Sequence, residues 1–436
     1  MNTILLHPTD ILFFRDGRPM GGSLSGHGAA WPLPNIVNHA FHAALHRAQI
    51  EGVHKHVPGR SSSKRDYSVE NRKANGRPFG SLRTAGPFPV CTNGTAATWF
   101  FPRPADADDS GKPVILPTEA LGSSSLPSPL RYAVGSTIAP SKESPKAWWS
   151  EGAWNNYLGS TQRDESAARS FLKNDGDFAD TEHAYGIEIA PETGSVVNGQ
   201  FYSAHYLRTR PGWALGTFTE AWDKDLAEDL VVKLLNGNGK EIITGGQQRL
   251  CTAELLPKKN NPARLPLPLA PQIEGTKVKW ILLTPAIFPA INDHSGGWLP
   301  SWVDLSGKVQ LLDGPGKNFA ERHKVSQGNP IHARLVAAIT GKPIPVSGYA
   351  LPNSADPDRS AGGHKSTHLA VPAGAVYYFE ADSETDARKL AAALNWHGSS
   401  QSTEINNRRS TLMGEQGFGL GVTANWSTHV PGRPQS

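Results

Sequence analysis

The residues best suited to chemistry lie in two glycine turns. Residues 414–421 (GEQGFGLG) follow the basic pair Arg408-Arg409, and residues 245–249 (GGQQR) form a similar turn earlier in the chain. A backbone without Cβ atoms can approach a phosphate chain closely and direct several N–H groups at it. Each turn also fits an ordinary connection between a helix and a strand. Their occurrence in matched contexts predicts two similar domains that both face a polyanion.

Histidines offer a second kind of chemistry. His39, His42 and His46 fall on one face of a helical stretch and could bind zinc, as in a hydrolase. Their spacing is not HExxH and no carboxylate stands among them, so a polar helix face is the alternative. His27, between two glycines, is the best placed histidine for a metal-independent ribonuclease, although nothing marks it as a general base. We find no Ser-His-Asp order, P-loop or paired carboxylates, and we predict no catalytic residue, no metal site and no cofactor.

A basic stretch over residues 54–79 interrupts the regular pattern. It contains a run of three serines and many more cations than its two acids, Asp66 and Glu70. Such a charge run is usually a solvated loop. The functional alternative is an arm that follows phosphates and becomes ordered on binding. The cations of this stretch include Arg60, Lys64, Arg65 and Arg72.

Composition limits the class of protein. The chain has 436 residues, with 44 glycines, 35 prolines and a net charge of +4, which favours a loop-rich globular protein with strands and few long helices. Cys91 and Cys251 are far apart and form no CxxC motif, so a reducing cytoplasm fits. The N-terminus lacks a signal peptide pattern, and no apolar run reaches membrane-spanning length. We therefore expect a cytoplasmic protein that does not bind membranes.

Periodicity predicts the elements that must position these residues. The clearest helix is 33–48, with Pro34 in its first turn, and a later helix is expected at 222–234. Ser383 and Asp386 resemble a capping box that starts a third helix. A hairpin is expected around Thr193-Gly194. Further strands are expected at 3–7, 82–90, 98–101, 213–218, 250–255, 278–283 and 371–379.

The same succession of hairpin, helix, glycine turn and strand occurs in both halves. This predicts an α+β fold with two ferredoxin-like (RRM-type) domains and long insertions. The first domain would span 1–256, with insertions near 54–79 and 103–180. A Pro-rich linker would occupy 257–271, and the second domain 272–436.

Several segments resemble a known family. They are residues 12–19 (LFFRDGRP), 79–83 (FGSLR), 86–88 (GPF), 186–187 (GI), 207–208 (LR), 282–286 (LLTPA), 371–378 (VPAGAVYY) and 417–419 (GFG). In this order they are similar to the RAMP-superfamily subunit of type III-B CRISPR (Cmr) effector complexes that holds the guide-RNA 5′ tag. The chain departs from the family at 34–40 (PNIVNHA), where small and hydroxyl residues are usual, and at Gln247, where an acidic residue is common.

The resemblance implies a non-catalytic subunit that caps the guide end of a ribonucleoprotein. Its partners would be the guide RNA, the large polymerase-like subunit and neighbouring RAMP backbone subunits, with target RNA met only indirectly. A RAMP-type endoribonuclease that trims guide precursor through His27, and a zinc hydrolase built on the His39 helix, are the alternatives. The residues expected to bind RNA are Arg15, Arg18, His27, Asn35, His39, Arg60, Lys64, Arg65, Arg72, Arg83, Gly245, Gly246, Arg249, Arg408, Arg409, Gly414, Gly417, Phe418 and Gly419.

Overall fold

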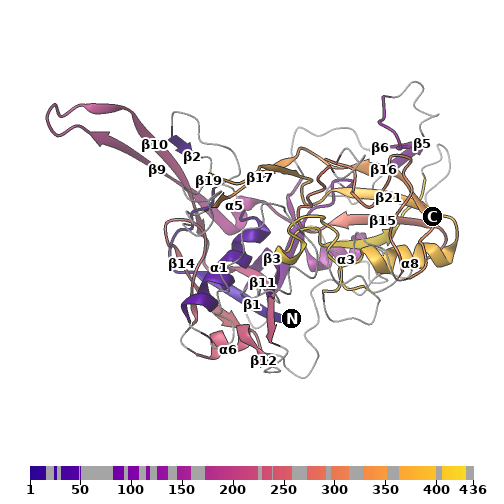
Figure 1. Cartoon of the computed structure of the whole chain (residues 1–436), viewed down its shortest axis with the longest axis horizontal. Coiled ribbons are helices and arrows are strands. Elements are labelled where there is room, and N and C mark those ends of the chain that lie inside the picture. Colours follow the sequence, from indigo (N-terminus) through magenta and orange to yellow (C-terminus); the bar gives the residue numbers. More distant parts are fainter. Residues whose placement is uncertain are drawn as a thin grey trace, which may run out of the picture. The chain divides into compact units, whose positions relative to one another are not determined.

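The computed structural model describes most of the chain in compact elements (Figure 1). The described residues are 1–15, 24–26, 31–48, 50, 82–92, 97–107, 114–117, 125–135, 145–158, 172–223, 228–237, 239–257, 273–290, 296–313, 328–350, 363–398 and 405–428. Within them, no helix is both long and apolar enough to cross a membrane. The chain forms two compact units, and each is built around an antiparallel sheet.

The first unit has the ferredoxin-like order of elements. Strand β1 (Asn2–Pro8), helix α1 (Pro34–Arg47) and strand β3 (Leu82–Cys91) are followed by β11 (Trp213–Asp223), α6 (Leu230–Asn236) and β14 (Leu250–Leu255). The sheet order is β14-β1-β11-β3, in which every neighbouring pair is antiparallel. This is the 4-1-3-2 order of the ferredoxin-like fold, in which each helix connects two strands that are not neighbours in the sheet.

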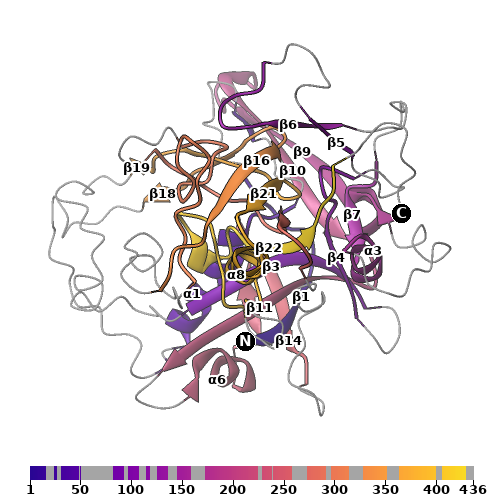
Figure 2. The ribbon, with the colours of Figure 1, turned by 90° about the vertical axis from the view of Figure 1, so that its right-hand side faces the viewer.

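The second unit repeats this order. Its strands are β15 (Lys277–Leu282), β16 (Ala333–Ile339), β21 (Val376–Ala381) and β22 (Gly421–Asn425). They are arranged β22-β15-β21-β16, again 4-1-3-2, and the neighbours β16 and β21 can be followed in Figure 2. Helix α8 (Glu384–Leu394) connects the third strand in sequence, β21, to the fourth, β22, and it packs on the sheet. Between β15 and β16, the described residues contain no α-helix. The predicted α+β fold with two ferredoxin-like domains is confirmed.

Helix boundaries follow the local signals in two cases and not in the third. Pro34 occupies the first turn of α1, and the Ser383 hydroxyl accepts a hydrogen bond from the Asp386 amide at 3.0 Å, as the capping box predicts. The helix expected at 222–234 begins only at Leu230, because β11 continues to Asp223 and pairs with β12 (Glu228–Asp229). Trp222 therefore lies in a strand, opposite Asp229.

A long hairpin is inserted into the first unit. Strands β9 (Ala179–Ile189) and β10 (Val196–Thr209) pair antiparallel around the predicted turn at Thr193-Gly194, and β2 (Leu24–Gly26) pairs with β10. Helix α5 (Asp175–Phe178) leads into the hairpin. The unit also contains β13 (Glu241–Ile243), β17 (Ile344–Val346), β18 (Tyr349–Ala350), β19 (Gly363–His364) and most of β20 (His368–Ala370).

The two units interleave along the sequence. Residues 99–174 belong to the second unit, and 344–369 belong to the first. Residues 99–174 contribute β5 (Val114–Pro117), β6 (Tyr132–Gly135), β7 (Trp148–Ser150), α3 (Glu151–Tyr157) and β8 (Leu172–Lys173), and most of β4 (Thr98–Pro102) also lies in the second unit. The division at 257–271 stays a prediction, since residues 258–272 lie outside the described part of the chain.

A buried polar cluster ties this early segment into the second unit. The Asp106 carboxylate accepts hydrogen bonds from Tyr378 Oη at 2.5 Å, Tyr157 Oη at 2.5 Å and Lys279 Nζ at 3.2 Å. Burial lowers the pKa of Lys279, and the adjacent Asp106 charge opposes that shift. Burial, and then the Asp106 charge, raise the pKa of Tyr157. Asp106 comes from the first half of the chain and Lys279 from the second, so the cluster fixes the early segment on the later sheet.

Candidate nucleic-acid interface

The C-terminal glycine turn is closely packed against its own unit. It contains the 3-10 turn Gly414–Gln416, and Gly417 and Gly419 have φ of +94° and +72°. A Cβ on Gly419 would overlap the backbone nitrogen of Ser410. The five amides of 416–420 donate to protein acceptors: Met413 O, Gly414 O, Met413 O, Pro285 O and Thr284 Oγ1, in that order. The protein itself therefore satisfies these five amides, which favours a packing role for the turn, and the phosphate cradle expected here stays a prediction.

The neighbouring predicted side chains are also buried. Arg408 and Arg409 are only 5% and 8% exposed. Arg408 Nη1 donates to Ile405 O at 3.2 Å, and Arg409 Nε donates to Ala393 O at 2.6 Å. Phe418 is fully buried in the core rather than available for base stacking. Their burial favours a structural role, and RNA binding by Arg408, Arg409 or Phe418 stays a prediction from the sequence pattern.

The first glycine turn makes a different set of contacts. Gly245 has φ of +87°, and a Cβ there would lie 2.5 Å from Phe13 O. The Gly246 amide donates to the same carbonyl at 2.8 Å. Gln247 and Gln248 then adopt left-handed φ values of +55° and +52°, which are uncommon outside glycine. The turn thus holds the segment of Phe13 in place and leaves both glutamines exposed.

Arg249 belongs to an aromatic and guanidinium cluster beside this turn. Its guanidinium carbon lies 5.3 Å from the centre of the Tyr206 ring, and Arg249 Nη2 donates to Gln247 Oε1 at 3.3 Å. Tyr206 Oη donates to the same oxygen at 2.9 Å, and the Phe13 ring lies 5.4 Å from Tyr206. Sequence reasoning identified Arg249 and missed Tyr206, which no local motif distinguishes from other strand tyrosines. We call Phe13, Tyr206, Gln247 and Arg249 the Tyr206–Arg249 cluster.

Carboxylates balance the arginines around this cluster. Arg208 Nη1 contacts Asp10 Oδ1 at 2.9 Å, Arg208 also pairs with Glu182, and Arg249 Nη1 lies 3.8 Å from Asp10 Oδ2. The hydrogen bond from Arg208 to Glu182 raises the pKa of Arg208. All of these side chains are partly exposed, so the pairs are screened and contribute little stability. An incoming phosphate can therefore exchange with the carboxylates at low cost.

Helix α1 places its predicted residues in different environments. Asn35 is 7% exposed, and its Oδ1 has no hydrogen-bond partner within the part of the chain that the structure describes. His39 keeps an exposed surface on α1, while partial burial of its ring by the surrounding chain, and then the Lys365 charge, lower its pKa. The rings of His42 and His46 contact each other in a tilted arrangement, with ring centres 4.8 Å apart. Among the described residues, no group of three or more His, Cys, Asp or Glu side chains could hold a metal ion.

The remaining predicted residues divide into two groups. Arg15 is exposed at the end of the segment that contacts the first glycine turn, and Arg83 is half-buried on β3, opposite Glu220. Six others lie outside the described residues, and their role stays a prediction: Arg18, His27, Arg60, Lys64, Arg65 and Arg72. The structure therefore brings Gly245, Gly246 and Arg249 together in the first unit, while the buried C-terminal set belongs to the second unit.

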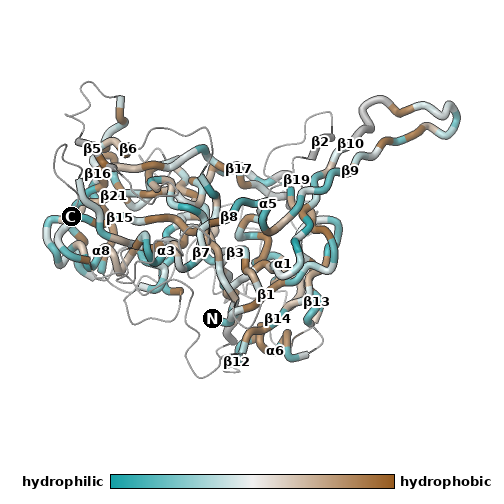
Figure 3. The backbone as a smooth tube through the Cα atoms, turned by 180° about the vertical axis from the view of Figure 1, so that it is seen from behind, coloured by the Kyte–Doolittle hydropathy of each residue, from teal (hydrophilic) through white to brown (hydrophobic). Residues whose placement is uncertain are grey.

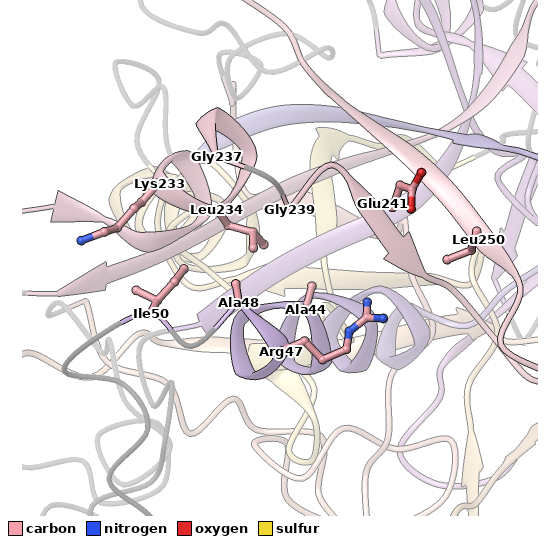
Figure 4. A pocket seen from close by; sticks show the side chains of 10 residues that line it. All are labelled: Ala44, Arg47, Ala48, Ile50, Lys233, Leu234, Gly237, Gly239, Glu241 and Leu250. Atoms are coloured by element: carbon pink, nitrogen blue, oxygen red, sulfur yellow. The ribbon is translucent and has the colours of Figure 1, made fainter.

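A pocket of about 500 Å³ lies elsewhere in the first unit (Figure 4). It is bounded by the end of α1, by α6 and by β13 and β14, and no predicted site residue lines it. Lys233 Nζ at its edge pairs with Glu228 Oε2 at 3.0 Å. The lining residues are Ala44, Arg47, Ala48, Ile50, Lys233, Leu234, Gly237, Gly239, Glu241 and Leu250.

Sequence comparison decides the family. The family model described as "CRISPR-associated protein (Cas_Cmr3)" matches residues 4–426. The chain belongs to this family. The match runs through both ferredoxin-like units and their insertions, so the family assignment covers nearly the whole protein. No curated protein sequence matches the chain.

Solved structures of type III complexes show a limited similarity to the chain. One chain of a type III-B Cmr-beta complex bound to cognate target RNA is 15% identical, with 86% of each chain covered and a TM-score of 0.41. A chain of a Csm3–Csm4 subcomplex of the type III-A CRISPR-Cas interference complex is 11% identical. There, 88% of this chain and 93% of that chain are covered, with a TM-score of 0.36.

Proposed function

We propose that this chain is a non-catalytic RNA-binding subunit of a type III-B CRISPR interference complex. It holds the 5′ tag of the guide RNA and docks on the large polymerase-like subunit beside RAMP backbone subunits. Family membership supports the assignment to a CRISPR system. The observation that supports RNA binding is the Tyr206–Arg249 cluster, in which a guanidinium lies over an aromatic ring beside two exposed glutamines.

The chemistry of this cluster suits a single-stranded RNA. The planar guanidinium of Arg249 can stack on a base while its N–H groups donate hydrogen bonds to a phosphate. Contacts with Tyr206 and Gln247 already orient this guanidinium. The exposed amides of Gln247 and Gln248 can both donate and accept, as base edges and 2′-hydroxyls require. Arg15 and Arg208 supply further positive charge once a phosphate displaces the carboxylates.

Substitution of Arg249 tests this proposal. Arg249→Ala should weaken binding of an RNA that carries the 5′ tag by roughly 5- to 30-fold, the effect of removing one charge-assisted hydrogen bond and one stacking partner. The salt dependence should fall by a slope of about 0.7, the value for one neutralised phosphate on a single strand. Arg388→Ala is the matched control, since Arg388 is an exposed arginine on α8 paired with Glu384. Equal affinities of wild type and Arg249→Ala would remove the cluster from the RNA site.

The isolated chain should show no ribonuclease activity. We base this expectation on the sequence of the two glycine turns, beside which no pair of residues suited to general acid–base catalysis stands. Incubation of the pure protein with repeat-containing RNA in a metal-chelating buffer provides the measurement. Cleavage that disappears in His27→Ala would instead support the endoribonuclease alternative.

A further inference from the structure

The distal half of the β9–β10 hairpin has an unusual surface for an RNA-binding protein. Among the described residues, six large apolar side chains are strongly exposed, and four belong to this hairpin: Tyr185 at 68%, Ile187 at 50%, Ile189 at 55% and Val196 at 54%. Single exposed apolar side chains are normal, whereas a group of them on one element marks a contact surface. Figure 3 shows the hydrophobic segments on the hairpin, and Figure 1 shows it extending beyond the other elements of its unit.

These side chains share one face of the hairpin. Tyr185, Ile187 and Ile189 are two residues apart on β9, and alternate residues of a strand point to the same side. Val196 on β10 is directly opposite Ile189, so it lies on that side too. We call these four residues the apolar hairpin face. Glu188 lies between Ile187 and Ile189 and therefore points to the other side.

Charge separates the possible partners. Residues 179–207 contain four acids and no lysine or arginine. Asp180 and Glu182, at the base, pair with Arg210 and Arg208. Glu188 and Glu192, toward the tip, are exposed, and no cation pairs with either among the described residues. A nucleic acid binds mainly through its phosphates, and it would be repelled by such a tip. A second copy of this chain would also bring its acidic tip against this one in a symmetric contact.

We propose that the apolar hairpin face docks on a protein subunit of the same complex, one that presents an apolar surface bordered by lysines or arginines. Aliphatic side chains supply most of the affinity in such a contact, and the acidic tip directs its approach. This inference rests on the proposed function, which supplies the complex. It assigns the tip of the hairpin to protein assembly and leaves the RNA with the Tyr206–Arg249 cluster near the hairpin base.

Two pairs of substitutions test the inference in a complex reconstituted from purified subunits and guide RNA. The double variant Ile187→Ser/Ile189→Ser should join the complex with roughly 10- to 100-fold lower affinity, the expected effect for two aliphatic side chains that become buried on binding. Its affinity for tag RNA should remain that of wild type. Leu305→Ser and Leu369→Ser are the matched controls, because these leucines are 54% and 57% exposed elsewhere in the chain. Both controls should assemble normally.

Charge reversal gives opposite results for the two kinds of partner. Glu188→Lys/Glu192→Lys should weaken assembly, and more so at low salt, because the long-range attraction between the acidic tip and the partner's cations becomes repulsion. The same change would strengthen RNA binding if the tip of the hairpin met RNA. Normal assembly of both double variants, or tighter RNA binding by the lysine variant with unchanged assembly, would overturn the inference. Failure of the wild-type chain to assemble or to bind guide RNA would instead refute the proposed function.

Discussion

Replacing Gly419 distinguishes a packing turn from an RNA cradle. Its φ of +72° lies in the left-handed region, and a Cβ would overlap the Ser410 backbone. A left-handed conformation costs a residue with a side chain about 1–2 kcal/mol, and forcing an extra group into a packed site costs about 1–3 kcal/mol more. Gly419→Ala should therefore reduce the free energy of unfolding by roughly 2–5 kcal/mol. For a unit of 150–250 residues this corresponds to a Tm lower by about 4–20 °C.

Gly275→Ala is the control that separates the two causes. Gly275 lies in the same unit with φ of +69°, but nothing lies within 4 Å of the Cβ position. Its substitution should cost only the conformational part, about 1–2 kcal/mol. The difference between the two variants then measures the close approach of the turn to Ser410.

Thermal melting and tag-RNA binding of both variants, measured below the melting range, provide the assay. We expect Gly419→Ala to melt earlier than Gly275→Ala and to bind tag RNA like wild type while folded. The reasoning fails if Gly419→Ala melts like wild type and loses RNA affinity, because that result requires a free backbone at the turn. Such an outcome would return the C-terminal turn to the RNA site.

Three further predictions concern the buried groups and the basic stretch. Asp106→Leu should destabilise the second unit by about 3–5 kcal/mol, because buried Lys279 then lacks a counter-charge. Adding Lys279→Met to this variant should restore most of the lost stability, as measured by denaturant unfolding. Burial raises the pKa of the Cys251 thiol from 9.0 to about 11. Between these pH values the folded state keeps a proton that the unfolded state loses, so the free energy of unfolding falls as pH rises from 9 to 11. Cys251→Ala should remove about 2–3 kcal/mol of that decline, whereas an unchanged decline would show that other groups cause it. Neutralising Lys64, Arg65 and Arg72 should weaken guide-RNA binding without changing its sequence preference. The slope of log affinity against log salt concentration should fall by about 0.7 for each phosphate that these side chains neutralise, and an unchanged slope would place them away from RNA.

Local patterns predicted the repeated architecture well. The hairpin turn at Thr193-Gly194, the start of α1 at Pro34 and the Ser383 cap are all short-range signals, and each is confirmed. The strand order 4-1-3-2 recurs in both units, although the described residues between β15 and β16 contain no α-helix. The prediction of a helix around Trp222 was wrong, because pairing with β12 extends the strand β11. Hydrophobic periodicity within one segment does not reveal such strand pairing.

Packing between distant parts of the chain could not be predicted from the sequence. The interleaving of the units depends on contacts such as Lys279 with Asp106, which are 173 residues apart. The burial of Arg408 and Arg409 was missed for a related reason. Arginine pairs usually mark a surface, but here backbone carbonyls accept their hydrogen bonds inside the unit.

The two glycine turns show why one motif can have two physical meanings. A missing Cβ allows the backbone to approach a ligand or to approach its own chain, and the sequence is the same in both cases. Each turn precedes the last strand of its ferredoxin-like sheet, and each packs on backbone, at Phe13 in one unit and at Ser410 in the other. Their side chains differ: Arg249 remains 28% exposed on an aromatic ring, whereas Arg408 and Arg409 are enclosed. Arg249 is therefore the residue at which RNA affinity should be tested first, and Gly419 the one at which stability should be.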